Sequence, residues 1–347
     1  MRDREFVAII MVDRLSLRFH QEKNTMMNRL LTACAALVLA FTASAQEYPT
    51  RTISIVVPFA AGGPTDTVAR LIAQSMTKTL GQTVIVENSA GAGGTIGVEK
   101  VAKAKPDGYS LLLMHIGIST SVSLYRNLRY DPQKDLEPIG LITDVPMTFI
   151  AKKDFPPKDM KELVTYVKAN KDKVTYANAG IGAASHLCGM LFMSAVQVDL
   201  TTVPYKGTGP AMTDLIGGQV DFMCDQTTNT TPQIKGGKVK AYAVTTKTRV
   251  KSLSELPTVD ESGLKGFEVA VWHGLWAPAG TPKGAIEKLN AALKVALKDP
   301  TLVSRFAELG TEPVAENRAT PDALRAHLKS EIEKWSPIIK KAGVYAD

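Results

Sequence analysis

Several features that mark nucleic-acid-binding, metal-dependent or hydrolytic proteins are missing from this chain of 347 residues. It has no dense block of lysine and arginine and no alternation of basic with aromatic residues, which argues against a nucleic-acid partner. The five histidines and three cysteines form no cluster with metal-ligand spacing, so the sequence predicts no metal site. A G-x-S-x-G nucleophile elbow is also absent. The formal net charge of +7 is a modest basic excess, which helps to attract an anion.

The amino-terminal segment has one apolar run, and it is short. Arg29 precedes the apolar residues 30–41, and small residues follow up to Ala45, an order that predicts a secretory signal peptide cleaved near Ala45. A run of about a dozen residues is too short to cross a bilayer, which takes roughly 20. We therefore expect export to the periplasm without a membrane anchor. Residues 1–25 lie upstream of this signal, and a start codon at Met26 or Met27 would leave them untranslated.

A lipoprotein is the alternative interpretation of this segment. The sequence Leu31-Thr32-Ala33-Cys34 resembles a cleavage box that would place a lipid on Cys34. Almost no apolar stretch precedes Cys34, whereas a complete one follows it. The secretory signal is therefore the favoured interpretation.

Two cysteines, Cys188 and Cys224, remain after removal of the signal, and an oxidising periplasm would allow them to form a disulfide. Cys188 falls in the first turn of an expected helix, and Cys224 lies near the end of an expected strand. These two places share one edge of the sheet in parallel α/β units, which favours the bond. Two buried thiols are the alternative.

Strand and helix patterns alternate along the mature chain. An expected strand at 53–58 precedes a helix that stops at Gly81, and strands at 83–86 and 110–115 continue the order βαβαβ, which predicts a parallel sheet. The same alternation recurs over 174–245. The carboxyl-terminal part is expected to be helical.

The length of the mature chain, about 300 residues, suggests two domains rather than one core. Two extended segments, 139–151 and 267–278, resemble crossings between two lobes. A discontinuous lobe that closes over a cleft gives a clamshell arrangement. The predicted division is a leader and signal peptide at 1–45, lobe 1 at 46–142 plus 272–347, and lobe 2 at 143–271.

Glycine-rich loops lie between predicted strands and predicted helices in both lobes. The free N–H groups and the positive dipole end of such a helix attract a carboxylate. The loop at 57–66 has two glycines and Asp66, which either fixes the loop or contacts a ligand. The loop at 178–186 belongs to the other lobe, so opposed helix starts could grip both ends of a dicarboxylate. The alternative is that the glycines serve only the turns.

A third glycine-rich loop, 88–95, also has features of a dinucleotide site. Gly91, Gly93 and Gly97 have a loose dinucleotide-binding spacing, which requires an acidic residue near the end of the next strand. That strand ends at 113–117 without a carboxylate. We therefore expect no dinucleotide and no other cofactor.

Ser185 and His186 are adjacent at a predicted helix start, and the pair suggests a hydrolase. Adjacent residues at such a place seldom point at one another, and no acid partner is evident. We therefore expect no enzymatic activity. His186 is expected to be a structural hydrogen-bonding residue, and Ser185 either caps its helix or donates its hydroxyl to a ligand.

In their order along the chain, the motifs resemble the substrate-binding proteins of tripartite tricarboxylate transporters, the Bug receptor family. The resemblance spans essentially the whole mature chain, with one departure at Ser89, where the family commonly has Arg-Pro. It implies a type II periplasmic-binding-protein fold, in which two α/β lobes, each with a mainly parallel sheet flanked by helices, are joined by crossing strands. The matching segments are 57–66, 88–97, 105–109, 180–186, 203–207 and 256–258.

The resemblance also implies a function. The protein would capture a small carboxylate, such as a di- or tricarboxylate, an acidic amino acid or an aromatic carboxylate, and deliver it by lobe closure to a membrane permease of one large and one small subunit. We expect a monomer. The alternative is a co-receptor that binds the same acid and signals through a membrane kinase. The expected ligand-binding residues are Phe59, Ala60, Ala61, Gly62, Gly63, Thr65, Asp66, Gly93, Gly180, Gly182, Ser185, His186, Tyr205 and Asp225.

Overall fold

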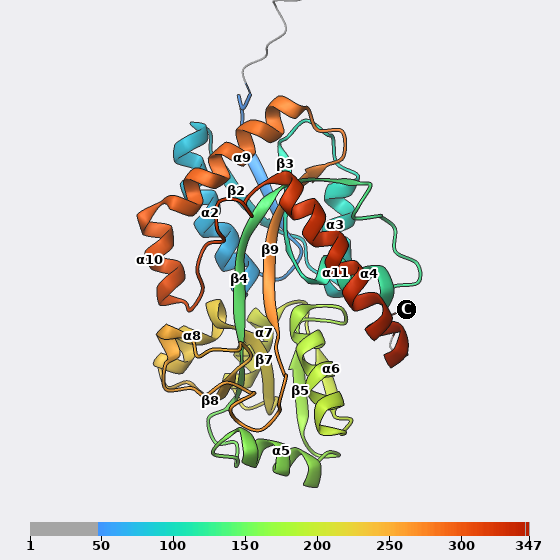
Figure 1. Ribbon diagram of the computed structural model, residues 1–347, viewed down its shortest axis with the longest axis vertical. Coiled ribbons are helices and arrows are strands. Elements are labelled where there is room, and N and C mark those ends of the chain that lie inside the picture. Colours follow the sequence, from blue (N-terminus) through green and yellow to red (C-terminus); the bar gives the residue numbers. More distant parts are fainter. Residues whose placement is uncertain (1–47, 344, 347) are drawn as a thin grey trace, which may run out of the picture. The chain divides into compact units, whose positions relative to one another are not determined.

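The structure is a computed structural model that describes residues 48–343, 345 and 346 (Figure 1). The predicted signal peptide and the alternative lipid site at Cys34 lie outside the described residues. Pro49–Asp347 form one compact unit.

The first strands of this unit are parallel and are connected by helices. β1 (Ile53–Val57) is almost entirely buried, as expected for a strand covered on both faces, and it pairs with β2 (Val84–Asn88) and β3 (Ser110–His115). The connecting helices are α2 (Pro64–Leu80) and α3 (Thr95–Ala102), and the buried face of α2 packs against β1 and β2. These elements confirm the predicted βαβαβ order and its parallel sheet.

Two long strands extend from this sheet and lie side by side in Figure 1. β4 (Leu136–Lys152) and β9 (Ala270–Pro278) are antiparallel, and β9 also pairs with β3. From Met147 onward, β4 changes partners and pairs with β7 (Phe222–Gln226) and β8 (Val239–Val244). We call β2, β1, β3, β9 and the first part of β4 sheet A, and the rest of β4 with β8, β7, β5 and β6 sheet B.

Sheet B repeats the alternation of parallel strands and helices. β5 (Thr175–Asn178) pairs in parallel with β7 and with β6 (Thr201–Pro204). Phe222 lies in its core, in contact with the rings of Tyr176 and Phe192. Its helices are α5 (Met160–Ala169), α6 (Ala184–Val196), α7 (Thr208–Ile216) and α8 (Thr227–Lys235).

The carboxyl-terminal part of the chain is helical, as predicted, and packs on sheet A. α9 (Lys283–Lys298) packs against α2, and α11 (Pro321–Ala342) packs against β4 and against α4 (Gly117–Leu124), a helix that had not been predicted. The remaining elements are α10 (Pro300–Glu308) and the short 3-10 helices η1 (Ala92–Gly94) and η2 (Lys251–Leu253).

The two predicted crossing segments, 139–151 and 267–278, overlap β4 and β9. β4 takes part in both sheets, and β9 pairs with β4 in sheet A. The bounds given above for lobe 1 and lobe 2 remain a prediction.

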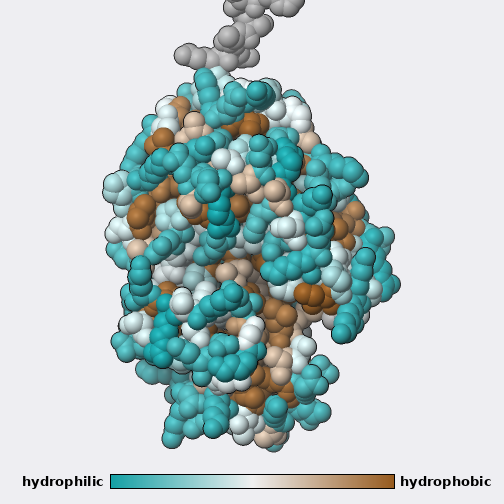
Figure 2. Space-filling view, in the orientation of Figure 1, coloured by the Kyte–Doolittle hydropathy of each residue, from teal (hydrophilic) through white to brown (hydrophobic). Residues whose placement is uncertain are grey.

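In the part of the chain that the structure describes, none of the helices has the length and apolar composition that a membrane span requires. The face shown in Figure 2 is mainly hydrophilic, with hydrophobic residues in smaller areas.

Candidate ligand-binding site

A cavity of about 10 Å³ lies where loops from sheet A meet loops from sheet B. Such a volume holds roughly one water molecule. Its walls come from the last residues of β3 and β7 and from the segments that follow β1, β5 and β6. All of these lie at the carboxyl ends of parallel strands, where open α/β sheets place their ligands. The lining residues are Phe59, Gly63, Pro64, Thr65, Asp66, His115, Ala179, Ala184, Ser185, Thr208, Asp225 and Gln226.

Six of the residues predicted from the sequence line this cavity. They come from three loops that are far apart in the chain, and they are Phe59, Gly63, Thr65, Asp66, Ser185 and Asp225.

The other predicted residues do not line the cavity in this form of the protein. Several of them instead form contacts between neighbouring loops, and the role of all fourteen in ligand binding remains a prediction. These residues are Ala60, Ala61, Gly62, Gly93, Gly180, Gly182, His186 and Tyr205.

The start of α2 presents free backbone groups at the cavity. Its N-cap, Gly63, has an extended conformation and supplies no side-chain cap, and Pro64 follows at the first helical position. The N–H groups of the first turn have no helical partner in any α-helix, so those of Thr65 and Asp66 are available to an anion.

Asp66 fixes the loop in front of α2. Its carboxylate accepts hydrogen bonds from Arg70 at 2.9 Å and from the Gly62 N–H and the Asn88 side chain, both at 3.0 Å. Burial by itself would raise the pKa of Asp66, but the hydrogen bonds from these three residues outweigh burial and lower it. Of the two roles considered for Asp66, the geometry favours loop fixation.

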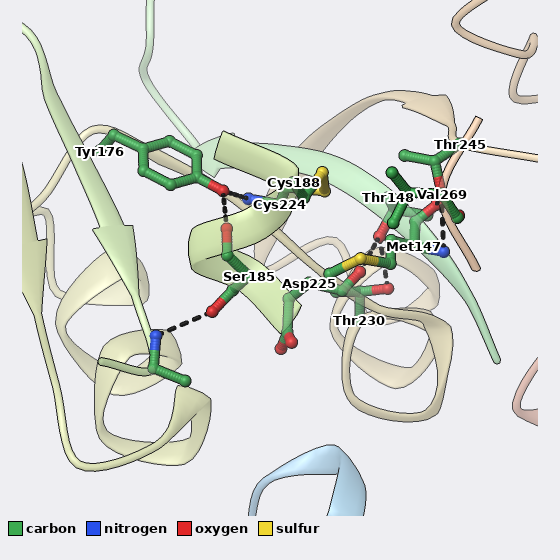
Figure 3. Close-up of a disulfide and its surroundings, with 11 residues drawn as sticks. Met147, Thr148, Tyr176, Ser185, Cys188, Cys224, Asp225, Thr230, Thr245 and Val269 are labelled. Carbon is green, nitrogen blue, oxygen red and sulfur yellow. Dashed lines mark hydrogen bonds between the residues drawn. A yellow bond between two sulfur atoms is a disulfide. The ribbon is translucent and has the colours of Figure 1, made fainter. Parts of the chain in front are cut away.

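Ser185 lies in the first turn of α6 and lines the cavity. The N-cap of α6 is Ala183, so Ser185 is not the cap, and its Oγ accepts a hydrogen bond of 2.8 Å from the Ala179 N–H. A hydroxyl that accepts one bond still has its proton to donate. The Tyr176 hydroxyl donates to the Ser185 carbonyl at 2.6 Å and accepts from the Cys224 N–H (Figure 3).

His186 has the structural role expected of it. Its Nδ1 accepts a hydrogen bond of 3.3 Å from the Gly182 N–H, and burial lowers the pKa of His186 to about 4, so the ring is neutral at pH 7. Ser185 and His186 thus bond to different backbone groups and do not form a nucleophile–base pair.

The end of β7 contributes an incompletely bonded carboxylate. Asp225 is 1% exposed, and its Oδ2 accepts a hydrogen bond of 2.6 Å from Asn229. Asp225 Oδ1, Thr208 Oγ1 and Gln226 Oε1 are buried without a hydrogen-bond partner among the described residues. Burial raises the pKa of Asp225 to about 6.

The histidine in the cavity wall is uncharged. His115 stacks on Phe59 with ring centroids 4.7 Å apart, and its Nδ1 accepts a hydrogen bond from the Gly117 N–H. Burial lowers the pKa of His115 to about 3 and lowers that of the neighbouring His273 well below 6.5. Because the cavity wall contains no lysine or arginine either, an anion there would be held by dipoles and hydrogen bonds.

Cys188 and Cys224 form a disulfide, with their Cα atoms 6.2 Å apart. Figure 3 shows how this bond connects α6, which carries Ser185, with β7, which carries Asp225. The covalent link therefore joins two elements of the cavity wall.

Further hydrogen bonds join the sheet A part of the chain to loops of the sheet B part. The Ala60 N–H donates to the Lys206 carbonyl at 2.9 Å. The Tyr125 hydroxyl donates to the Ile181 carbonyl at 2.8 Å, and a further bond of 3.0 Å joins the Thr120 hydroxyl to the Gly182 carbonyl. These bonds hold the cavity closed.

Several wall residues were missing from the predicted set. His115 ends β3 and Thr208 opens α7, so both lie at the strand ends and helix starts from which the other residues were selected. Pro64 and Gln226 are direct neighbours of predicted residues. Ala179 and Ala184 carry no polar side chain, and nothing in the sequence singles them out.

Parallel strands with helix starts around a cavity, and a long strand, β4, that takes part in both sheets, define a periplasmic binding protein of the type II fold. Residues 68–344 match the family model described as the tripartite tricarboxylate transporter family receptor, and the chain belongs to this family. Because members of this family are solute-binding receptors, the protein is a receptor and not an enzyme.

Three solved structures illustrate the similarity. The periplasmic binding protein BugD is 60% identical, with a TM-score of 0.84, over 86% of this chain and 99% of that one. MatC from Rhodopseudomonas palustris, solved with bound malate, is 44% identical, with a TM-score of 0.82, over 84% of this chain and 100% of that one. An R. palustris protein solved with adipate is 34% identical, with a TM-score of 0.82, over 86% and 99% of the two chains.

Proposed function

We propose that this protein captures a small carboxylic acid in the periplasm and delivers it to a membrane permease of one large and one small subunit. The observation that carries the proposal is the cavity into which the starts of α2 and α6 project from two different sheets. Each start offers backbone N–H groups and the positive end of a helix dipole, which stabilise a carboxylate without a cationic side chain.

The chemistry of two relatives supports this ligand class. One is solved with malate and the other with adipate, both of which are dicarboxylates. Two opposed helix starts suit a ligand with a carboxylate at one or both ends. The ligand of this protein accordingly belongs to the small organic acids.

Capture requires the walls of the cavity to separate. About 10 Å³ holds one water molecule, and every carboxylic acid is larger. Lobe 1 (46–142 plus 272–347) and lobe 2 (143–271) would move apart, with β4 and β9 as the hinge. This movement would break the hydrogen bonds between the two lobes, and the lobes would close again on the ligand. A ligand that contacts both lobes binds the closed form more tightly and so shifts the protein towards it.

Calorimetric titration with a panel of aliphatic, amino and aromatic carboxylic acids tests capture, and small-angle scattering tests closure. We expect at least one acid to bind and to reduce the radius of gyration at saturation. Binding without any change in that radius would refute lobe closure, and failure of every acid to bind would refute the ligand class.

Delivery is tested by uptake of the identified acid in cells that express the permease with or without this receptor. We expect uptake to depend on both. Undiminished uptake without the receptor would exclude delivery and favour the signalling co-receptor.

A further inference from the structure

Thr245, the residue directly after β8, holds two points of the chain where it passes between sheet A and sheet B. Thr245 is fully buried. Its hydroxyl donates a hydrogen bond of 2.6 Å to the Val269 carbonyl and accepts one of 3.1 Å from the Met147 N–H (Figure 3). Backbone hydrogen bonds join Thr245 to the same two residues. Met147 in β4 and Val269, directly before β9, are therefore fixed to the sheet B part of the chain.

Glu331 of α11 holds β9 on the sheet A side. Its Oε2 accepts hydrogen bonds from the indole N–H of Trp272 at 3.1 Å and from that of Trp335 at 2.9 Å. All three residues are buried. Trp272 belongs to β9, whereas Trp335 lies one turn after Glu331 in α11 itself. Of these two hydrogen bonds, the one from Trp272 ties a long strand to a helix.

A buried carboxylate is a costly acceptor for the two indoles. Moving a charge out of water carries a large free-energy penalty, which Lys334 offsets in part, with its Nζ 3.2 Å from Glu331 Oε1. A buried indole of β9 does not always have an acceptor, because Trp276 Nε1 has no partner among the described residues. Apolar packing often serves stability as well as a buried charge does. The pairing of Trp272 with Glu331 therefore points to a role beyond stability.

β4 is fixed at the residue opposite Trp272. Asp144 faces Trp272 in the strand ladder, and its carboxylate forms an ion pair with Arg318. The hydroxyl of Thr143, directly before it, donates to the Glu312 carbonyl at 2.7 Å. Both strands are thus attached to the carboxyl-terminal part of the chain at the same level. Because the side chains of Asp144 and Arg318 are more than one-third exposed, water weakens their ion pair, and the buried Glu331 contact is the firmer of the two.

Four residues lie between these two sets of contacts. They are Val145 and Pro146 in β4, which face Val271 and Ala270 in β9. Pro146 has no N–H and cannot donate a hydrogen bond to the ladder. Protein hinges are typically a few residues that absorb a large change in backbone dihedral angles. The two strands can therefore bend at these four residues without breaking the contacts on either side.

We propose that Glu331 is a positioning residue for ligand capture: through Trp272 it fixes β9 to α11 and so confines the bending of the hinge to 145–146 and 270–271. This inference rests on the lobe closure of the proposed function, because it assigns the place at which the lobes bend. Without the Glu331 contact more of β9 is free to bend, and each further residue that has to be ordered on closure carries an entropic cost. A short hinge brings the loops around the cavity back to the same positions.

Trp272→Phe and Trp335→Phe are matched variants, since each removes one indole N–H from the same carboxylate oxygen. Trp272→Phe detaches β9 from α11, whereas Trp335→Phe changes a contact within α11. Both are compared with the unmodified receptor in the absence of any acid. Thermal unfolding confirms that each variant is folded.

Double electron–electron resonance measures the distribution of distances between the lobes. Spin labels are attached through Asn127→Cys and Ser194→Cys, two exposed positions in the predicted lobe 1 and lobe 2. The native cysteines form a buried disulfide and do not take up the label. We expect a broader distribution for Trp272→Phe, and for Trp335→Phe the width found in the unmodified receptor.

Replacement of Glu331 itself gives a second, independent pair of variants. Glu331→Leu removes the acceptor, whereas Glu331→Gln keeps a carbonyl oxygen for the indole of Trp272. We expect the leucine variant to broaden the distribution and the glutamine variant to restore its width. This pair also decides the matter if Trp272→Phe does not fold.

Titration calorimetry with malate, glutamate and benzoate connects the hinge to capture. Any of these acids that binds the unmodified receptor should bind Trp272→Phe about two- to tenfold more weakly, the usual effect of losing one hydrogen bond. Trp335→Phe should bind it with unchanged affinity.

The outcomes separate this proposal from the broader function. Equal widths for Trp272→Phe and the unmodified receptor refute the role of Glu331, and so does equal broadening in both tryptophan variants, which would reflect a general loosening of α11. If an acid binds but all the distributions are alike, carboxylate capture stands and the hinge proposal fails. If the distributions differ as expected but no carboxylic acid binds, the hinge stands and the proposed function fails.

Discussion

Cys188 and Cys224 join α6 to β7 by a disulfide that lies three residues after Ser185 and directly before Asp225. The Tyr176 hydroxyl reinforces the same connection, because it bonds to the backbone of both Ser185 and Cys224 (Figure 3). One wall of the cavity is therefore held together by a covalent bond and by a buried tyrosine. Movement between the lobes would leave this wall intact.

Replacement of both cysteines, Cys188→Ala with Cys224→Ala, is expected to lower the free energy of unfolding by about 3 kcal/mol. The reason is that the disulfide, across 36 residues of sequence, restricts the unfolded chain. Urea denaturation with and without a reducing agent measures the effect. The reducing agent should destabilise the unmodified protein and leave the double variant unchanged; equal stability of the oxidised and reduced unmodified protein would contradict this account.

Gly93→Ala is expected to weaken ligand binding by about tenfold or more, because it opposes the closed form. A Cβ at Gly93 would overlap the Ile181 carbonyl of the facing loop, and it would come within 2.8 Å of the Tyr125 hydroxyl. Ligand titration measures the affinity, and small-angle scattering measures the remaining compaction. Unchanged affinity would mean that this contact does not form when ligand is bound.

Gly81→Ala is the matched control for that variant. Gly81 has a φ of 66°, close to the 60° of Gly93, but a Cβ there would meet nothing within 4 Å. Both substitutions place alanine in a left-handed conformation, at a cost of about 1 kcal/mol in stability. Only Gly93→Ala should also impair binding.

Tyr125→Phe tests the hydrogen bond that joins the two walls. Its loss removes about 0.5–1.5 kcal/mol from the closed form, so ligand affinity should fall by about two- to tenfold with little change in stability. Tyr130→Phe is the control, since the Tyr130 hydroxyl contacts Ser121 within the sheet A part of the chain. Equal effects of the two variants on affinity would show that the Tyr125 bond has no specific role in closure.

The elements of the fold that the sequence predicted well are those with an apolar pattern. β1 and β3 are nearly continuous apolar runs, and α2 and α9 have one buried face, so periodicity alone identifies them.

α8 (Thr227–Lys235) was missed because its buried residues are polar. The Thr227 and Thr231 hydroxyls bond to backbone carbonyls of Gly310 and Leu309, and Thr230 bonds to Thr148. Hydrogen bonds to partners about 80 residues away along the chain cannot be recognised from the hydrophobic pattern of the sequence.

The candidate site could be predicted only in outline for a similar reason. The rule that strand ends and helix starts surround a ligand selected Phe59, Ser185 and Asp225, and these three residues line the cavity. Which residue of each loop faces the cavity depends on how the loops meet, for example on the bond between Ala60 and Lys206. Local sequence does not encode how the loops meet. Nor does it reveal that the Tyr205 hydroxyl bonds to Asp214.

Buried histidines should make the protein less stable in acid. Burial lowers the pKa of His115 to about 3, of His186 to about 4 and of His273 well below the ordinary 6.5. Between about pH 6.5 and 4 the unfolded chain therefore binds protons at three sites that the folded chain leaves empty. Asp225 opposes this trend, because its raised pKa of about 6 gives the folded chain one extra proton between about pH 6 and 3.8.

Three histidines outweigh one carboxylate, so the free energy of unfolding should fall as the pH decreases from 6 to 4, by on the order of 2 kcal/mol per pH unit. Urea denaturation at intervals of half a pH unit measures the slope. Asp225→Asn removes the opposing proton and should make the loss steeper, whereas His186→Asn should make it shallower by roughly one proton. Stability that stays constant or rises below pH 6 would show that these histidines are protonated in the folded protein, and the neutral cavity wall described above would then be wrong.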